Sequence, residues 1–466
     1  MMRSMFSGVS GLRTHQARMD VIGHNIANVN TVGFKASRMT FADTFSQTMQ
    51  GASAPNAETG RGGTNPMQVG LGVNISSIQR LMTTGGAQRT DDPFHLMIEG
   101  AGFFVVGDDV GGLFFTRAGD FQQDRDWNIH LNGLRLQGWQ APWQAGGPAR
   151  EDGVPRPIQS GPVQGIQILP SMRNVQPAAT GNIFFEGNIN PADRDIARVI
   201  NFHDSLGQTY SMNMRFVFDE TATPPAWRIH HANTITRTSS NPNETLTLSG
   251  VTAVGGWVEV TTPTLQFGPD GLPVMMTNAN PPVAIPGAFE MHLQIDTTGA
   301  SGPTFEIGQP HNPATPAVRT ILIDFSGLTQ YRRATNANAS DMDGMESGDL
   351  VGLSIGPDGI VSGTYSNGQN FALWQIALAT FDNPAGLMAM GSNLFSTTPN
   401  SGLFDGTGLT PGSAGTRLLG GTVEMSNVDL AAEFTEMITT QRGFQANSRI
   451  ITTSDEILQE LVNMKR

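Results

Sequence analysis

The strongest constraint on the fold is a seven-residue spacing of apolar side chains that occurs near both ends of the chain and not between them. Such a repeat keeps one stripe of a helix facing its partner, so the two ends are predicted to pair as helices with a left-handed crossing. The predicted seam residues are Met5, Val9, Leu12, Met19, Ile26, Leu430, Phe434, Met437, Phe444, Ile451 and Leu458.

The charges of the two ends are complementary. Residues 1–30 carry three arginines against one aspartate, whereas residues 427–464 carry six acidic side chains against two arginines. The positions that alternate with the apolar ones include Gln16, Gly23, Gln441 and Ser448, which add little to a seam. We therefore expect a weak pair that becomes ordered only when neighbouring subunits assemble.

The ends of the two helices carry capping residues. Asn28, Asn30 and Gly33 tolerate the left-handed conformation and are expected to end the first helix. Ser426 or Asn427 is expected to accept hydrogen bonds from the free amides at the start of the last helix.

The region between the helices has the composition of a β-rich protein. Its many turns are indicated by the 55 glycines and 28 prolines of the chain. Hairpin turns are predicted at Asn132 with Gly133 and at residues 357–359. Two segments alternate between apolar and polar side chains, which is typical of strands with one buried face. Their apolar members are Tyr210, Met212, Met214, Phe216 and Phe218 in one segment, and Phe289, Met291, Leu293 and Ile295 in the other.

The predicted fold class is a mainly β multidomain protein with paired N- and C-terminal α-helices, that is, an α-helical coiled-coil core plus β-rich outer domains in a nested topology. A chain of 466 residues has room for two to four domains. We expect a terminal helical core at 1–34 and 425–466, a linker or arm at 35–92 and 391–424, an inner β-domain at 93–144 and 341–390, and an outer β-rich domain at 145–340.

Composition also excludes several classes of function. A net charge of -13 opposes binding to nucleic acid or to anionic lipid, and the absence of cysteine excludes disulfides and thiolate sites. Residues 1–20 are interrupted by Arg13, His15, Gln16 and Arg18, so we expect no cleaved signal peptide. No apolar run approaches the roughly 18 residues that span a bilayer, so membrane insertion is not expected.

Three patterns could suggest chemistry, and each has a structural explanation. Ser354 lies in a Gly-x-Ser-x-Gly pattern, but a hairpin turn follows where a hydrolase needs a helix. The acidic cluster at 341–349 lacks the ligand and glycine positions of a calcium loop. His230 and His231 would point to opposite faces of a strand, which separates them as metal ligands. We expect no catalytic residue, no metal site and no cofactor.

Several segments resemble the bacterial flagellar rod and hook proteins. At the N-terminus the resemblance lies in residues 7–12 and 25–35, and it extends through 100–104, 116–119, 363–368 and 425–462. In the middle it is confined to patches such as 204–207. The residues that carry the N-terminal signature are Asn25, Asn28, Thr31, Gly33, Phe34 and Lys35.

The resemblance implies a structural subunit of the flagellar hook that polymerises into a hollow, flexible helical tube and transmits torque from rod to filament. It also implies export by the flagellar type III apparatus, location in the flagellum outside the cytoplasm, and contacts with further copies and with hook cap, distal rod and hook–filament junction proteins. The distal rod protein is an alternative, although its usual shortness makes the insert at 145–340 favour the hook. A secreted β-rich hydrolase or adhesin is the alternative of a different class.

Overall fold

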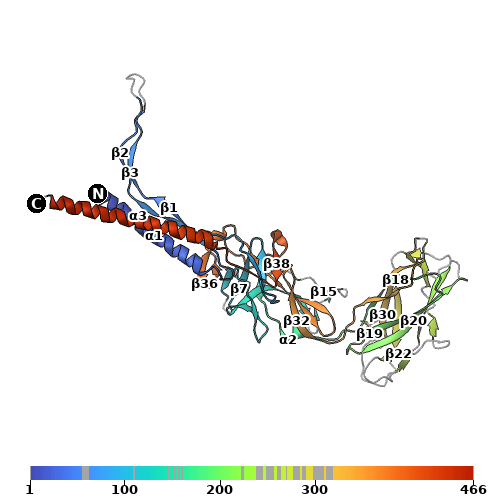
Figure 1. Ribbon diagram of the computed structural model, residues 1–466. Coiled ribbons are helices and arrows are strands. Elements are labelled where there is room, and N and C mark those ends of the chain that lie inside the picture. Colours follow the sequence, from blue (N-terminus) through green and yellow to red (C-terminus); the bar gives the residue numbers. More distant parts are fainter. Residues whose placement is uncertain are drawn as a thin grey trace.

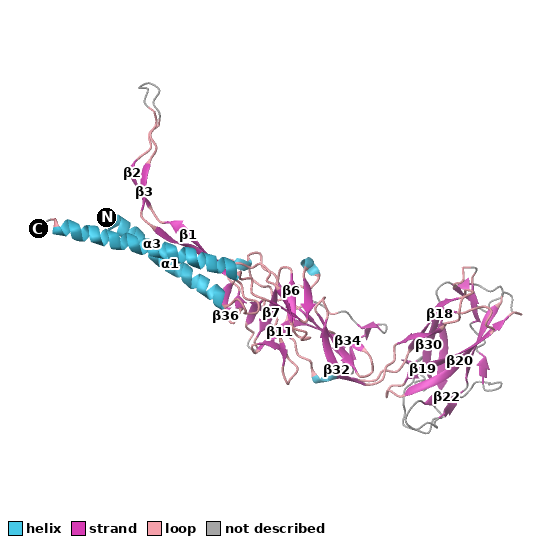
Figure 2. Ribbon diagram, viewed as in Figure 1, coloured by secondary structure: helices cyan, strands magenta, loops and turns pink. Residues whose placement is uncertain are grey.

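The computed structural model is elongated, with a pair of long helices at one end, a β-rich unit in the middle and a second β-rich unit at the other end (Figure 1). It describes residues 2–54, 62–108, 111–144, 147–148, 150–151, 154–155, 158, 161–221, 225–232, 234–237, 245–247, 257–259, 264–268, 270–276, 284–285, 290–296, 309–310 and 318–464. Figure 2 shows that strands dominate everything outside the helix pair. The predicted mainly β fold class with terminal helices is therefore confirmed.

The two terminal helices are α1 (Met2–Ala27) and α3 (Leu430–Asn463), and they lie side by side with both chain termini at the far end of the molecule (Figure 1). Asp429 begins α3, because its side chain accepts hydrogen bonds from the amides of Ala431 and Ala432. The expected cap at Ser426 or Asn427 was wrong. The Asn427 amide is instead used in tertiary contacts with Ala36, Leu81 and Thr83.

A two-stranded arm leaves the helix pair, with β1 (Ser37–Asp43) paired to β4 (Val73–Arg80) and β2 (Ser46–Gln50) paired to β3 (Met67–Gly70). Figure 1 shows it projecting away from the rest of the chain. Residues 35–92 were expected to form a linker or arm, and their composition gave no indication of the strands within them. An antiparallel ladder satisfies backbone groups without a buried core, so a composition that offers little to bury does not exclude strands.

The inner unit is built on a large sheet whose central order is β32 (Gly348–Ile355), β33 (Ile360–Tyr365), β34 (Asn370–Ile376), β11 (Leu134–Gln140), β7 (Phe103–Gly107) and β8 (Leu113–Thr116). The first and last thirds of the chain thus interleave in one sheet. Its core contains Leu96, Phe104, Leu136, Leu373 and Trp374, all of which are buried. The predicted turns are present, since Asn132, Gly133 and Gly359 all have positive φ.

Two expected boundaries differ from the strand pairing. In the range assigned to the outer domain, β16 (Gln164–Gly165) pairs with β11 and β17 (Asn174–Val175) pairs with β32. In the range assigned to the linker, β37 (Leu394–Ser396) pairs with β8, and β38 (Arg417–Gly420) pairs with β6 (Leu96–Glu99). These strands are too short to show a periodicity, and only contacts with distant residues place them in the inner unit.

The outer unit packs two sheets around one core. One sheet has the order β28 (Glu290–Asp296), β30 (Val318–Thr329), β18 (Asn182–Asn188) and β31 (Asn338–Met342), and the other contains β19 (Asp195–His203), β20 (Thr209–Asp219) and β21 (Ala226–Ala232). Tyr210, Met212, Met214 and Phe216 are buried between them, as predicted, and Phe218 packs at the edge. Met291, Leu293 and Ile295 lie in β28, whereas Phe289 lies outside the described residues.

Candidate assembly interface

Glycines bring α1 and α3 close together. A Cβ atom added to Gly11 would lie 2.8 Å from the side chain of Asn447, and one added to Gly443 would lie 2.7 Å from the ring of His15. Gly8 packs against Ile451 in the same way, at 3.3 Å. Each interior glycine costs a helix about 0.5–1 kcal/mol relative to alanine, so these positions trade helix stability for a close approach.

The buried face of the helix pair is small and polar rather than rich in leucine. On α1 it contains Gly8, Gly11, Thr14, Ile22 and Asn25, and on α3 it contains Thr440 and Ser454. A seam of this kind buries little apolar area and gives correspondingly little stability.

The eleven predicted seam residues divide into two sets. Three of them are exposed and do not lie between α1 and α3, because the glycine faces turn them outward: these are Val9, Leu430 and Phe434. The other eight are partly buried, and Ile451 among them packs against Gly8: these are Met5, Leu12, Met19, Ile26, Met437, Phe444, Ile451 and Leu458. The period of the pattern was visible in sequence, but the face that turns inward was not.

Polar contacts cross the helix pair near its base. The Arg18 guanidinium lies 2.9 Å from the Glu436 carboxylate, and the Asn25 amide donates to Glu433 at 2.9 Å. Burial, together with the neighbouring Glu436 and Asp429, raises the pKa of Glu433. The expected charge complementarity is therefore present at this end of the pair.

Large apolar side chains cover the outward faces of the helices and arm. On α3, Ile438 is 54% exposed, and on the arm Phe45 is 80% exposed. Further exposed members are Phe6, Phe434, Ile450, Ile457, Leu461, Val462, Met49, Met67, Val69, Ile75 and Ile78. Large apolar side chains exposed in such number on one part of a molecule indicate a protein contact or a membrane contact. Among the helices that the structure describes, none is long and apolar enough to cross a membrane.

The signature residues build the turn that joins α1 to the arm. Asn25 exchanges hydrogen bonds with the backbone of Ser37, and the Thr31 hydroxyl donates to the Asn28 side chain. Gly33 has φ +70°, and a Cβ atom there would lie 2.5 Å from the amide nitrogen of Ala118. Phe34 is buried beside it. These residues therefore set the direction in which the chain leaves the helix pair.

Three charged side chains are buried where the two chain ends meet the inner unit. The Lys35 ammonium lies 2.6 Å from one oxygen of Glu424, and the Arg117 guanidinium lies 3.4 Å from the other. All three side chains are at most 4% exposed. Lys35 also donates to the carbonyl of Thr83, and Arg117 to that of Gly100. Burial lowers the pKa of Lys35, while the Glu424 carboxylate opposes that shift.

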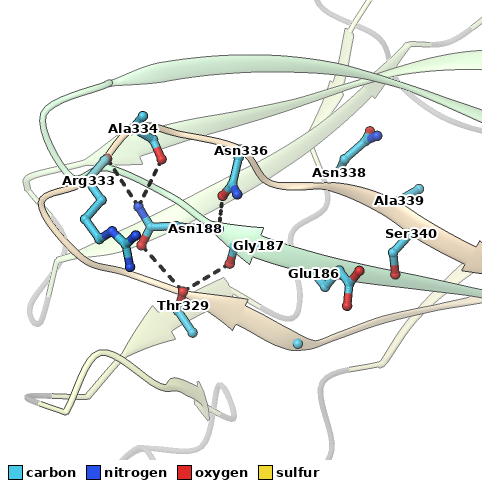
Figure 3. A pocket seen from close by; sticks show the side chains of 11 residues that line it. Glu186, Gly187, Asn188, Thr329, Arg333, Ala334, Asn336, Asn338, Ala339 and Ser340 are labelled. Atoms are coloured by element: carbon cyan, nitrogen blue, oxygen red, sulfur yellow. Dashed lines mark hydrogen bonds between the residues drawn. The ribbon is translucent and has the colours of Figure 1, made fainter.

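An open polar pocket of about 920 Å³ lies on the outer unit, beside β18, β30 and the loop that precedes β31 (Figure 3). The Asn188 amide donates to the carbonyls of Arg333 and Ala334, and the Thr329 hydroxyl donates to the carbonyl of Gly187. The Asn188 backbone amide donates to Asn336. These bonds hold the loop, so the polar lining has a structural use.

The patterns that could suggest chemistry have structural settings. Ser354 lies in β32, and the hairpin turn after it replaces the helix that a hydrolase requires. His231 is buried in β21 while its neighbour His230 is half-buried. In the acidic cluster, Asp343 accepts from the amides of Gly181 and Asn182. Among the described residues, no group of three His, Asp or Glu side chains is placed to hold a metal ion.

Family models for flagellar proteins match successive parts of the chain. The model "Flagella basal body rod protein" matches residues 5–35, "Flagellar hook protein FlgE/F/G D1 domain" matches 97–185, "Flagellar basal body protein FlaE D2 domain" matches 176–345, and "Flagellar basal body rod FlgEFG protein C-terminal" matches 419–464. The matches therefore cover both helices and both β-rich units.

Full-length relatives include hook proteins. The flagellar hook protein FlgE of Borreliella burgdorferi is 37% identical over 487 residues, and that of Treponema pallidum is 34% identical over 485 residues; both alignments cover 100% of each chain. The flagellar basal-body rod protein FlgG of Bacillus subtilis is 28% identical over 467 residues, also with 100% of each chain covered.

A leucine at Gly11 should separate the helices. Overpacking costs about 1–3 kcal/mol at a tight contact, which exceeds the helix propensity of about 0.5–1 kcal/mol gained on replacing glycine. Gly11→Leu should therefore raise the critical concentration for self-assembly. Gly23→Leu is the matched control, because nothing lies within 4 Å of a Cβ atom there, and it should lower or preserve that concentration. Equal effects of the two substitutions would contradict the glycine contact.

Removing Glu424 should cost more than removing Lys35. Glu424→Gln leaves two buried cations without a carboxylate, and breaking a buried ion pair costs about 3–5 kcal/mol. Lys35→Met leaves Arg117 and Glu424 as a balanced pair, so its cost should be clearly smaller. Urea unfolding followed by tryptophan fluorescence gives both free energies of unfolding. A larger loss for Lys35→Met would show that the charge balance of the cluster is not what matters.

The contact between α1 and the base of the arm should become less stable in mild acid. Burial, and secondarily Arg18, lowers the pKa of His15, whose ring meets Phe41 of β1 edge-on at 5.6 Å. The unfolded state therefore binds more protons below the ordinary histidine pKa of 6.5, and stability is lost as the pH falls through that value. Assembly should weaken between pH 7.5 and 5.5, and His15→Gln should flatten this dependence. Glu433 acts in the opposite sense, because burial raises its pKa and it therefore adds stability as the pH falls.

Proposed function

This chain belongs to the flagellar hook protein family, and from that premise we propose how its parts act in a structural subunit of the bacterial flagellar hook. The chain is a self-polymerising axial component of the flagellum. Its family is structural rather than enzymatic, and we propose that the chain itself has no catalytic activity. The observation that carries the proposal is the apolar surface on α1, α3 and the arm, which a single copy leaves exposed.

The exposed faces are suited to contacts between different patches of successive subunits. The exposed apolar side chains of α3 include Phe434, Ile438 and Ile457, whereas those of the arm include Phe45 and Met49. Contacts between unlike patches generate open helical polymers when the rotation does not close. In the proposed tube, the helix pairs form the inner layer and the β-rich units lie outside them.

The weak seam between α1 and α3 fits export as an unfolded chain. The helices meet through glycine, threonine, serine and asparagine, and isolated helices gain most of their stability from packing. We infer that the subunit passes unfolded through the flagellar type III apparatus without a cleaved signal peptide and becomes ordered at the growing tip. There it would meet the hook cap, and at the ends of the finished tube the distal rod and junction proteins.

We assign the bending of the proposed tube to the β-rich units that lie outside the helix pairs. The outer unit is joined to the inner unit by only two chain segments, and surfaces with polar rims can slide over one another at lower cost than large apolar ones. The tube would then bend while it transmits torque from rod to filament. A role in the distal rod is the second candidate, supported by the full-length similarity to a basal-body rod protein.

A charge on the outward stripe should block assembly without disturbing the fold. Ile438→Asp places a carboxylate on the exposed face of α3, away from the contact with α1, and should raise the critical concentration for tube formation at least about ten-fold, since about 1.4 kcal/mol corresponds to that factor. Thr439→Asp, at the neighbouring exposed position, is the matched control and should assemble normally. Electron microscopy and sedimentation measure tube formation, and normal tubes from Ile438→Asp would refute the proposed inner layer.

A further inference from the structure

Two short segments connect the inner and outer units. The outgoing one, residues 176–181, and the returning one, residues 343–347, are bridged by reciprocal backbone hydrogen bonds between Ala178 and Met345, both 3.0 Å long. Asp343 of the returning segment also accepts from the backbone amides of Gly181 and Asn182. The segments therefore form a narrow two-stranded neck. Units joined in this way are expected to move relative to one another unless something else restrains them.

The turn between β19 and β20 is rigid and rests against this neck. Asp204 is fully buried, and its carboxylate accepts from the amides of Leu206 and Gln208 and from the Tyr210 hydroxyl. Gly207 at the tip has φ +79°. The sequence resemblance in this otherwise divergent region lay in the same residues, 204–207. The internal hydrogen bonds give this turn one conformation.

The turn contacts both segments of the neck. A Cβ atom added to Gly207 would lie 2.9 Å from Pro177 Cβ of the outgoing segment and 3.4 Å from the Ser347 amide nitrogen of the returning one. Thr180, which is fully buried, exchanges hydrogen bonds of 2.9 Å with the backbone of His203. The outer unit therefore contacts the neck at more than one point.

Glu346 ties the same turn to the inner unit. Its carboxylate accepts from the Thr209 hydroxyl, and His203 Nδ1 lies 4.0 Å from the same oxygen. Its backbone carbonyl accepts from the side chain of Asn367, in the turn between β33 and β34. One residue of the neck thus binds the outer unit through its side chain and the inner unit through its backbone.

We propose that residues 203–209 are a joint clamp that fixes the angle between the inner and outer units and thereby sets the bending stiffness of the assembled tube. The stiffness half rests on the proposed function, whereas the angular restraint concerns a single subunit. Without the clamp, the neck would behave as a hinge that absorbs backbone rotation. With it, rotation must break the Gly207 contact, the Thr180 pair and the Thr209 bond together.

The restraint can be measured in the full-length chain, which contains no cysteine. Cysteines introduced as Val351→Cys in the inner unit and Val199→Cys in the outer unit are both exposed and can carry spin labels. Pulsed dipolar spectroscopy then gives the distribution of distances between the units. Gly207→Val should broaden that distribution at least about two-fold, because the new side chain displaces the turn from Pro177.

Gly133→Val is the matched control. Gly133, in the turn between β10 (Ile129–Leu131) and β11, has a φ of +87°, but nothing lies within 4 Å of its Cβ position, so it carries the backbone strain without the contact. It should leave the distribution unchanged. Gly207→Val could unfold the outer unit, which would change the fluorescence of buried Trp227. In that case Thr209→Val provides the test, because it removes only the bond to Glu346 and the contact with His203. Unchanged widths in the folded variants would overturn the clamp.

The consequence for the tube is tested separately. Tubes of Thr209→Val subunits should be less stiff, which electron microscopy detects as a wider range of curvatures than among wild-type tubes. If the distance distribution broadens while the range of curvatures stays unaltered, the proposed effect on stiffness is overturned and the angular restraint remains. Failure of the wild-type chain to form tubes would instead refute the proposed function, and the two failures are therefore distinguishable.

Discussion

The buried carboxylate of Glu424 is the interaction on which the arrangement of the chain depends. It lies just before α3, and it holds Lys35, just after α1, and Arg117 of the inner unit. The oxygen that meets Lys35 also accepts from the backbone amide of Gly85, at the base of the arm. A buried charge that loses its partners is costly, so the four segments are held in one relative placement. The helix pair therefore leaves the inner unit in a defined direction.

The parts of the molecule differ in how much of their stability comes from contacts within one subunit. The inner and outer units each have a core of buried apolar side chains. The helix pair is held by glycines, small polar residues and the Arg18–Glu436 ion pair, while its outward faces and the arm expose large apolar groups. Stability that a single copy lacks must come from its neighbours. This difference suits a subunit whose inner and outer units fold by themselves, while the helix pair and the arm become stable on polymerisation.

Much of the fold could be predicted because its signals are local. The alternation around Tyr210 and Phe216, the turn at Asn132 with Gly133 and the apolar period of the terminal helices each depend on neighbouring residues, and all are present in the structure. The strands of the arm, the assignment of β16 and β17 to the inner unit and the Asp429 cap were missed. Each depends on a partner far away in sequence or on competition for the same side chain, as when Asn427 binds Ala36 instead of capping α3.

The class of the molecule could be predicted from its residues alone: two helical ends of complementary charge flank β-rich units, and the N-terminal signature points to the flagellar axis. Which faces of the two helices meet is known only from the folded chain. The apolar period specifies a stripe, but Gly11 and Gly443 allow a closer contact beside that stripe, and this contact depends on two surfaces together. The clamp at residues 203–209 could not be predicted for the same reason. Its turn contacts the neck only after the chain has folded.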